Sequence, residues 1–148
     1  MIPLKSAKSQ ITPCPATQQE ANFVENKLME FNAQQVPFTQ DKPFIDINYV
    51  LKDEVGCIIG GINATSYCWK ILYISILWID EHLRNHGHGS QLLNKVETEA
   101  KKMGCSLTHL DTFDFQAKDF YLKHGYEVFG VWNDCPPGHT RYFMRKKL

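Results

Sequence analysis

The residues best placed to do chemistry form a short loop that contains two glycines and one arginine. This loop follows the apolar run 71–79 and leads into a segment whose apolar residues recur at helical spacing. The first turn of a helix has unpaired backbone N–H groups and a partial positive charge, and glycine lets such a backbone approach a phosphate closely. The pattern therefore predicts an anion site at a helix start. The loop residues are Arg84, Asn85, His86, Gly87, His88, Gly89 and Ser90.

Two better-known phosphate loops do not fit these residues. A Walker loop needs Gly-Lys-Ser/Thr, but Gly89 is followed by Ser90 and Gln91. A dinucleotide-binding fingerprint needs a third glycine at position 92, which is Leu92. What remains is Arg-x-x-Gly-x-Gly after a predicted strand. Taken alone, this pattern fits a phosphate loop and a plain glycine-rich connection equally well.

A second segment, 113–126, decides between these two interpretations. The loop resembles motif A of the GNAT family of N-acetyltransferases, Gln/Arg-x-x-Gly-x-Gly/Ala, and 113–126 resembles motif B, Asn-x-x-Ala-x-x-Phe-Tyr-x-x-x-Gly-Phe. Asp114 stands at the usual Asn position and is expected to change a contact with the pantetheine arm of the coenzyme. The resemblance is firmest over 71–132. The residues in register are Ala117, Phe120, Tyr121 and Gly125, and Tyr126 replaces the final Phe.

The resemblance implies direct transfer of an acetyl group from acetyl-CoA to a primary amine. In this family the loop holds the coenzyme diphosphate, and the strand before it holds the pantetheine and can supply a backbone donor to the developing oxyanion. Tyr121 matches the usual general acid that protonates the departing thiolate. The expected cofactor-binding residues are Leu77, Trp78, Ile79, Arg84, Asn85, His86, Gly87, His88, Gly89, Ser90, Gln116 and Tyr121.

The general base that takes a proton from the acceptor amine is not marked by any pattern. Asp111 and His109 lie at a predicted strand end that faces the expected cleft, and His139 follows a turn. Glu81 and His82 precede the loop, and each of the five residues also has an ordinary structural explanation. We select Asp111 as the second catalytic candidate beside Tyr121. No metal site is expected, because no carboxylate or cysteine is placed to complete a ligand shell with His82, His86 and His88.

The elements that must position these residues alternate between helix and strand. Thr17 and Glu20 have the spacing of a capping box, Gly60-Gly61 predicts a bulge or a close backbone approach, and Gly104 ends a helix. The expected fold is a mixed α/β single domain over 1–148. For this fold the resemblance implies a central, mostly antiparallel twisted sheet with a splayed pair of strands, flanked by helices. The predicted helices are 17–33, 92–103 and 117–124, and the predicted strands are 44–52, 55–67, 71–79 (buried on both faces), 106–112, 126–132 and 139–144.

Composition excludes several classes of partner. Sixteen basic residues balance sixteen acidic ones, so no overall charge draws the chain to nucleic acid or to an anionic membrane. The start lacks the apolar run of a signal peptide, and 71–79 is too short to span a bilayer as a helix. Five scattered cysteines without a C-x-x-C pair suit reduced thiols in a cytoplasmic protein.

The preferred function is acetylation of a small molecule that carries an amine. Two alternatives stay open: acetylation of a protein N-terminus or lysine, and a non-catalytic acyl-CoA-binding module. The sequence leaves undecided which amine accepts the acetyl group, whether other acyl groups are used, and whether the protein is a homodimer.

Overall fold

A computed structural model describes residues 10–148, which divide into two units at Pro37 and Phe38. The first unit contains helix α1 (Gln18–Gln35). The Thr17 hydroxyl accepts from the Glu20 N–H at 3.2 Å, and the Glu20 carboxylate accepts from the Thr17 N–H at 3.0 Å. The predicted capping box is therefore confirmed, and the helix ends two residues later than expected.

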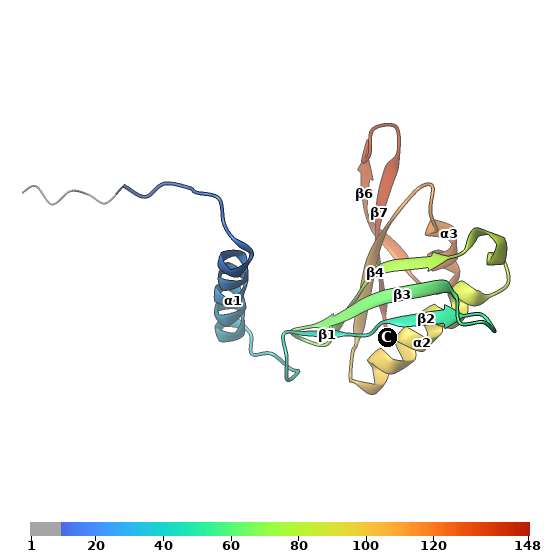
Figure 1. Ribbon diagram of the computed structural model, residues 1–148, viewed down its shortest axis with the longest axis horizontal. Helices are drawn as coiled ribbons and strands as arrows, with labels where there is room; N and C mark the ends of the chain where they lie inside the picture. The colour runs from blue at the N-terminus through green and yellow to red at the C-terminus, as the bar shows by residue number, and fades with distance from the viewer. Residues whose placement is uncertain (1–9) are drawn as a thin grey trace, which may run out of the picture. The chain divides into compact units, whose positions relative to one another are not determined.

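The second unit, Phe38–Leu148, is built on one sheet (Figure 1). Within the described residues the sheet has seven strands in the order β1-β3-β4-β5-β7-β6, with β2 also paired to β3. All neighbouring strands are antiparallel except β4 and β5. This mixed α/β architecture confirms the expected fold class. The strands are β1 (Phe44–Asp46), β2 (Tyr49–Lys52), β3 (Ile58–Tyr67), β4 (Ile71–Ile79), β5 (Leu107–Phe113), β6 (Glu127–Asn133) and β7 (Thr140–Lys147).

The predicted strand 44–52 is wrong in one respect, because it is two strands. In the gap between β1 and β2, the side-chain oxygen of Asn48 accepts from the Ala64 N–H of β3 at 3.1 Å. This side-chain bond takes the place of a backbone ladder bond to β3. The strand predicted from position 55 begins only at Ile58. Its first residues instead form a turn in which the Asp53 carboxylate accepts from the Cys57 N–H at 2.8 Å.

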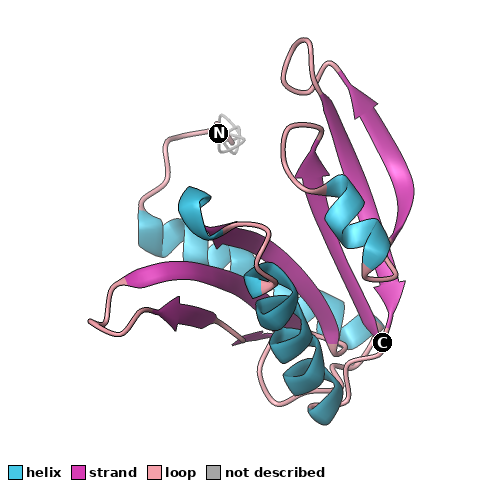
Figure 2. Ribbon diagram, turned by 90° about the vertical axis from the view of Figure 1, so that its right-hand side faces the viewer, coloured by secondary structure: helices cyan, strands magenta, loops and turns pink. Residues whose placement is uncertain are grey.

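Strands β4 and β5 are paired over only part of their length. Their parallel ladder runs from Ile71↔Leu107 to Ile74↔Leu110 and then stops. Opposite β3, the register of β4 shifts after Ile74, so that Ser75 lies in a bulge at the point where the ladder ends. Figure 2 shows the two halves of the sheet diverging from this paired stretch. The splayed pair implied by the resemblance is therefore present.

The expectation that 71–79 is buried on both faces is wrong for its second half. Ile76 and Trp78 are 54% and 46% exposed, because β5 no longer lies beside β4 there. Gly60 of β3 lies against this half of β4: a Cβ at Gly60 would come 2.7 Å from Ile79 Cδ1. The close backbone approach predicted for Gly60-Gly61 is thus confirmed.

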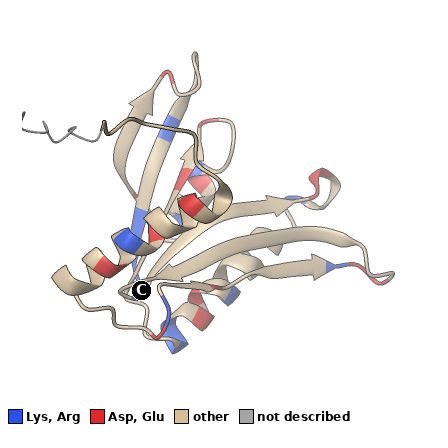
Figure 3. Cartoon of the chain, turned by 60° about the vertical axis from the view of Figure 1, so that its left-hand side comes forward, with Lys and Arg blue, Asp and Glu red and all other residues tan. Residues whose placement is uncertain are grey.

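Two helices of the second unit pack against the sheet. Helix α2 (His88–Lys102) contacts β2, β3 and β4, and helix α3 (Lys118–Lys123) places Tyr121 in the same hydrophobic core. Gly104 and Gly125 follow the two helices with φ of 90° and 87°, as their sequence positions predict. Figure 3 marks the basic and acidic positions along the chain; on α2, Glu99 accepts from Lys95 at 2.8 Å and from Lys102 at 3.1 Å.

A polar cluster lies inside this core. The Glu97 carboxylate of α2 accepts from Lys146 Nζ at 2.8 and 3.0 Å and from the Tyr126 hydroxyl at 3.0 Å. Burial raises the pKa of Tyr126, so that its hydroxyl remains a donor.

No disulfide joins the five cysteines, all of which lie within residues 10–148. In that same range, none of the helices is long and apolar enough to cross a bilayer.

Candidate functional site

A cleft of about 760 Å³ lies where β4 and β5 separate. Its walls are the second half of β4, the end of β5 with the loop after it, the glycine loop, the first turn of α2 and part of α3. The cleft thus brings together residues from both motifs that the sequence singled out. Twelve of the predicted site residues line it: Leu77, Trp78, Ile79, Arg84, Asn85, Gly87, His88, Gly89, Ser90, Asp111, Gln116 and Tyr121.

The glycine loop turns at two residues whose backbone has the left-handed conformation. Asn85 has φ 63° and Gly87 has φ 81°, and Gly87 is the residue before the first turn of α2. No side chain caps this helix start, and a Cβ at Gly87 would meet nothing within 4 Å. The first-turn N–H groups therefore remain available to an anion, with space in front of them.

Two side chains of the loop contact backbone carbonyl groups. Arg84 Nε donates to the Ile79 carbonyl at 3.0 Å, which ties the loop to the end of β4. The His86 ring nitrogen Nδ1 lies 2.7 Å from the Arg84 carbonyl oxygen. His86 is exposed and does not line the cleft, unlike the other six loop residues. The loop geometry thus supports an anion site built from backbone rather than from histidine side chains.

A contact between α2 and α3 was not foreseen from the sequence. The Ser90 hydroxyl lies 2.9 Å from His124 Nε2, and the His124 ring also packs on Phe120 with centroids 4.6 Å apart. A Cβ at Gly89 would touch the same Phe120 ring at 3.4 Å. The helical spacing of Phe120 and His124 had predicted a packed helix face, but nothing in the spacing shows that this face meets the anion loop.

Strand β4 presents an open backbone edge to the cleft. Its ladder to β3 extends to Ile79, whereas its ladder to β5 ends at Ile74. Within the described chain, the stretch from Leu77 to Ile79 therefore has one edge without a neighbouring strand, and all three of its residues line the cleft. This is the geometry by which an extended ligand can add to a sheet through main-chain hydrogen bonds.

Tyr121 lines the cleft and is 6% exposed. Burial, together with the negative charge of Asp111, raises the pKa of its phenol to about 12. Among residues 10–148, no side chain or backbone group hydrogen-bonds to its hydroxyl. The hydroxyl is thus a protonated donor facing a cavity.

Asp111 faces the same cleft but is already engaged by two neighbours. Arg141 donates to Asp111 Oδ2 through Nε at 2.9 Å and through a terminal nitrogen at 2.6 Å. The Tyr73 hydroxyl donates to Asp111 Oδ1 at 3.1 Å. These bonds raise the pKa of the Arg141 guanidinium, and burial together with the Asp111 charge raises that of the Tyr73 phenol. The carboxylate is thereby fixed in one orientation at the start of the splay.

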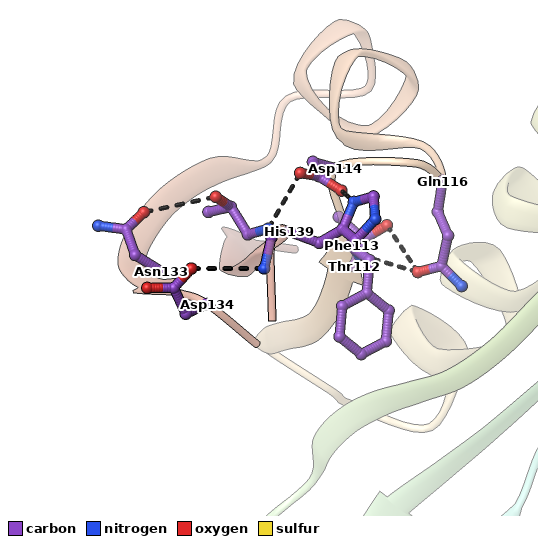
Figure 4. Close-up of polar contacts among 9 residues, drawn as sticks. Thr112, Phe113, Asp114, Gln116, Asn133, Asp134 and His139 are labelled. Carbon is purple, nitrogen blue, oxygen red and sulfur yellow. Dashed lines mark hydrogen bonds and ion pairs between the residues drawn. The ribbon is translucent and has the colours of Figure 1, made fainter. Parts of the chain in front are cut away.

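Asp114 and Gln116 stabilise the loop that follows β5 (Figure 4). Asp114 Oδ1 lies 2.9 Å from His139 Nδ1, and Asp114 Oδ2 accepts from the Thr140 N–H at 3.0 Å. Desolvation raises the pKa of Asp114, but its hydrogen bonds to Thr140 and His139 together outweigh this effect, so the pKa lies below its usual value. Gln116 Oε1 accepts from the Phe113 N–H at 2.8 Å. Asp114, which departs from the family's Asn, therefore joins this loop to the β6–β7 turn.

The other base candidates lie outside the cleft lining. His109 is bonded to the Tyr67 hydroxyl at 2.8 Å, and burial lowers its pKa although the Asp111 charge opposes this. Glu81 and His82 are exposed, and His139 is paired with Asp114. In residues 10–148 no group of three or more His, Cys, Asp or Glu side chains could hold a metal ion.

Comparisons with known proteins agree with this geometry. A model described as the acetyltransferase (GNAT) family matches residues 15–126. Among curated proteins, the chain is 37% identical over 96 residues to blasticidin-S acetyltransferase of Streptomyces morookaense, covering 64% of this chain and 70% of that protein.

Solved structures give the same result. An acetyltransferase from Bacillus cereus superposes with a TM-score of 0.82 at 40% identity, covering 93% of this chain and 98% of that one. A Bacillus anthracis structure, provisionally assigned as a streptothricin acetyltransferase and solved with acetyl coenzyme A, superposes with a TM-score of 0.62. That pair is 22% identical, covers 73% and 65% of the two chains, and is evidence of fold alone.

Proposed function

Because the chain belongs to the GNAT family of acetyltransferases, we propose that it transfers an acetyl group from acetyl-CoA to a primary amine of a small molecule. The observation that carries the proposal is the cleft at the β4–β5 splay, which joins the anion loop to the buried Tyr121. A curated relative is named for the acetylation of a small molecule, blasticidin S. A structural neighbour of the same fold holds acetyl coenzyme A.

The residues present fit the coenzyme. The uncapped first turn of α2 and the open space at Gly87 suit a diphosphate, and Arg84 adds a positive charge beside them. The open edge of β4 suits the amide groups of a pantetheine arm. When bound, acetyl-CoA supplies the activated thioester, and every other requirement falls to side chains and backbone groups of this chain.

Tyr121 holds the proton that the reaction needs at the leaving sulfur. Its phenol stays protonated because burial raises its pKa to about 12, and its hydroxyl has no partner within the described residues. A neutral phenol in the cleft can hydrogen-bond to the developing thiolate and pass its proton to the sulfur as the carbon–sulfur bond breaks. We therefore assign Tyr121 as the general acid.

Asp111 is the one acidic residue among the described residues that line the cleft. Its carboxylate lines the cleft and accepts two hydrogen bonds from Arg141, both on Oδ2. In this proposal Asp111 accepts an N–H of the incoming amine and orients the nitrogen lone pair. That Asp111 also takes a proton from the amine, as the general base, stays a prediction.

Two other functions remain to be distinguished by experiment. We test them with a panel of small amines and an array of peptides, each incubated with labelled acetyl-CoA while thiol release is followed. Label on small amines with stoichiometric thiol release supports the proposal. Label on peptides alone supports a protein acetyltransferase, and coenzyme binding without any transfer supports a non-catalytic module. Three expectations stay predictions: a single domain over 1–148, a cytoplasmic location and the lack of a nucleic-acid partner. The oligomeric state stays undecided.

A further inference from the structure

Phe115 is an aromatic side chain that lines the cleft and yet is 60% exposed. Its ring stacks on Phe113 with centroids 5.3 Å apart and an interplanar angle of 6°. The edge of the His139 ring packs against it, with centroids 5.1 Å apart at 87°. One face of Phe115 is therefore covered by a parallel ring, and the ring keeps a large open apolar surface at the cleft wall.

The loop that carries Phe115 is fixed in place on both sides. Before it, Asp114 is bonded to His139 and to the Thr140 N–H, at 2.9 and 3.0 Å. After it, Gln116 accepts from the Phe113 N–H at 2.8 Å (Figure 4). A ring held in this way loses little conformational freedom when a ligand packs on it, so it can contribute to affinity as a preformed platform.

The platform lies on the same side of β5 as Asp111. Thr108, Leu110 and Thr112 are buried, so the alternate residues, Asp111 and Phe113, point to the opposite face of the strand. Two residues along a strand span about 7 Å. Since Phe115 stacks on Phe113, a flat apolar surface and a fixed carboxylate line the same cleft at the splay.

Asp111 keeps capacity for a further donor. Its Oδ2 accepts twice from Arg141, whereas Oδ1 accepts only from Tyr73 among the described residues. A carboxylate can accept about four hydrogen bonds, which leaves one position on Oδ1. An amine N–H is a donor of the kind that this position suits.

We propose that the acceptor is a primary amine attached to a planar aromatic or conjugated ring, with the ring stacked on Phe115 and the amine donating to Asp111. This inference rests on the proposed acetyltransfer and adds the chemical class of the acceptor. The rival explanation is that Phe115 contacts the coenzyme or only packs its own loop. Stacking on a preformed aromatic ring favours the planar acceptor over a saturated one by roughly threefold to tenfold.

The test compares benzylamine with cyclohexylmethylamine, two primary amines that differ in the flatness of the ring. For each we measure kcat/KM by thiol release, and the affinity for the coenzyme-A-loaded protein by calorimetry. The variants are Phe115→Leu and, as a matched control, Phe129→Leu. Phe129 is also an exposed phenylalanine, at 50%, but it lies on β6 against Phe143 and does not line the cleft.

The expected result is a preference for benzylamine of about threefold to tenfold in the unsubstituted protein and in Phe129→Leu, falling to about onefold to twofold in Phe115→Leu. The affinity for coenzyme A should be equal in all three proteins. A preference that is absent, or that survives in Phe115→Leu, overturns the inference while leaving acetyltransfer intact. Weaker coenzyme binding in Phe115→Leu assigns the ring to the coenzyme and overturns it too. If calorimetry shows the Phe115-dependent preference without any thiol release, the proposed function fails and the aromatic subsite stands.

Discussion

The Ser90 hydroxyl lies 2.9 Å from His124 Nε2, and this contact links the first turn of α2 to the residue that caps the end of α3. Ser90 has a single hydroxyl proton, so its role depends on the imidazole. If Nε2 is an acceptor, the proton points to His124. If Nε2 carries a hydrogen, the ring donates to Ser90 and the serine proton is free for a bound diphosphate.

We predict that His124 assists coenzyme binding through Ser90. His124→Phe keeps a ring against Phe120 but removes the hydrogen bond, and should weaken the affinity for coenzyme A about threefold to tenfold. Ser90→Ala should have a similar effect, and the double variant should be no weaker than either single one. Calorimetric titration measures the three constants. Fully additive losses would show that the two residues act independently.

At Gly87, the anion loop should tolerate a larger neutral side chain but not a negatively charged one. A Cβ at this position meets nothing within 4 Å, although φ of 81° makes any side chain somewhat strained. Gly87→Asn and Gly87→Asp make similar demands on the backbone, and only the second adds a charge. We expect the Asp variant to lose coenzyme binding by at least about 100-fold relative to Asn. Equal affinities for the two variants would refute a diphosphate at this loop.

Tyr121→Phe should separate chemistry from binding. Loss of a general acid lowers kcat by about 100-fold to 10000-fold, whereas the affinity for coenzyme A should be nearly unchanged. The phenol has a raised pKa of about 12, so it remains protonated as the pH rises through the neutral and mildly alkaline range. The kcat profile should therefore show no alkaline loss attributable to Tyr121 below about pH 11. Unchanged turnover in Tyr121→Phe would remove this residue from the reaction.

The buried cluster of Glu97, Lys146 and Tyr126 should matter for stability rather than for activity. Lys146→Met removes the partner of a carboxylate whose residue is only 5% exposed, which should cost about 3 kcal/mol of unfolding free energy. Adding Glu97→Leu should restore much of it, because no unpaired charge then remains in the core. Urea denaturation measures both. A single variant as stable as the unsubstituted protein would contradict the cluster's assigned role.

His109 should make the protein less stable in acid. Burial lowers its pKa in the folded state, so below about pH 6.5 the unfolded chain binds the proton more readily than the folded chain does. This contribution to stability is present above that pH and is lost as the pH falls towards the lowered pKa. His109→Gln should reduce the difference in Tm between pH 7.5 and pH 5.5. The exposed His82→Gln is the control, and an equal change in both variants would contradict the prediction.

The sequence predicted what local chemistry determines. The capping box of Thr17, the glycine ends of α2 and α3 and the anion loop all follow from residues close together in the chain. The break between β1 and β2 could not be predicted in this way, because it depends on Asn48 bonding to Ala64 across the sheet. Such a contact exists only once the strand register is set.

The candidate site likewise contains residues that local spacing predicts and contacts that only the tertiary structure creates. Motif spacing identified Tyr121 and the loop, but Arg141 reaches Asp111 only because β5 and β7 pair with Asp111 opposite Phe143. His124 and Ser90 are 34 positions apart in the chain, so their contact also depends on tertiary packing. Asp114 is expected to alter a coenzyme contact, which stays a prediction, and its bonds to His139 and Thr140 in the β6–β7 connection were not foreseen. Each of these residues acquires its role from tertiary pairing, which periodicity does not encode.

The most direct test of the account is a single-turnover experiment. The protein is loaded with acetyl-CoA labelled in the acetyl group and mixed with the best amine from the panel, and the label is followed together with free thiol. The account predicts that label appears on the amine nitrogen in step with one thiol released per acetyl group transferred. Label that stays on the coenzyme, appears as acetate or remains on the protein would contradict direct acetyl transfer in this cleft.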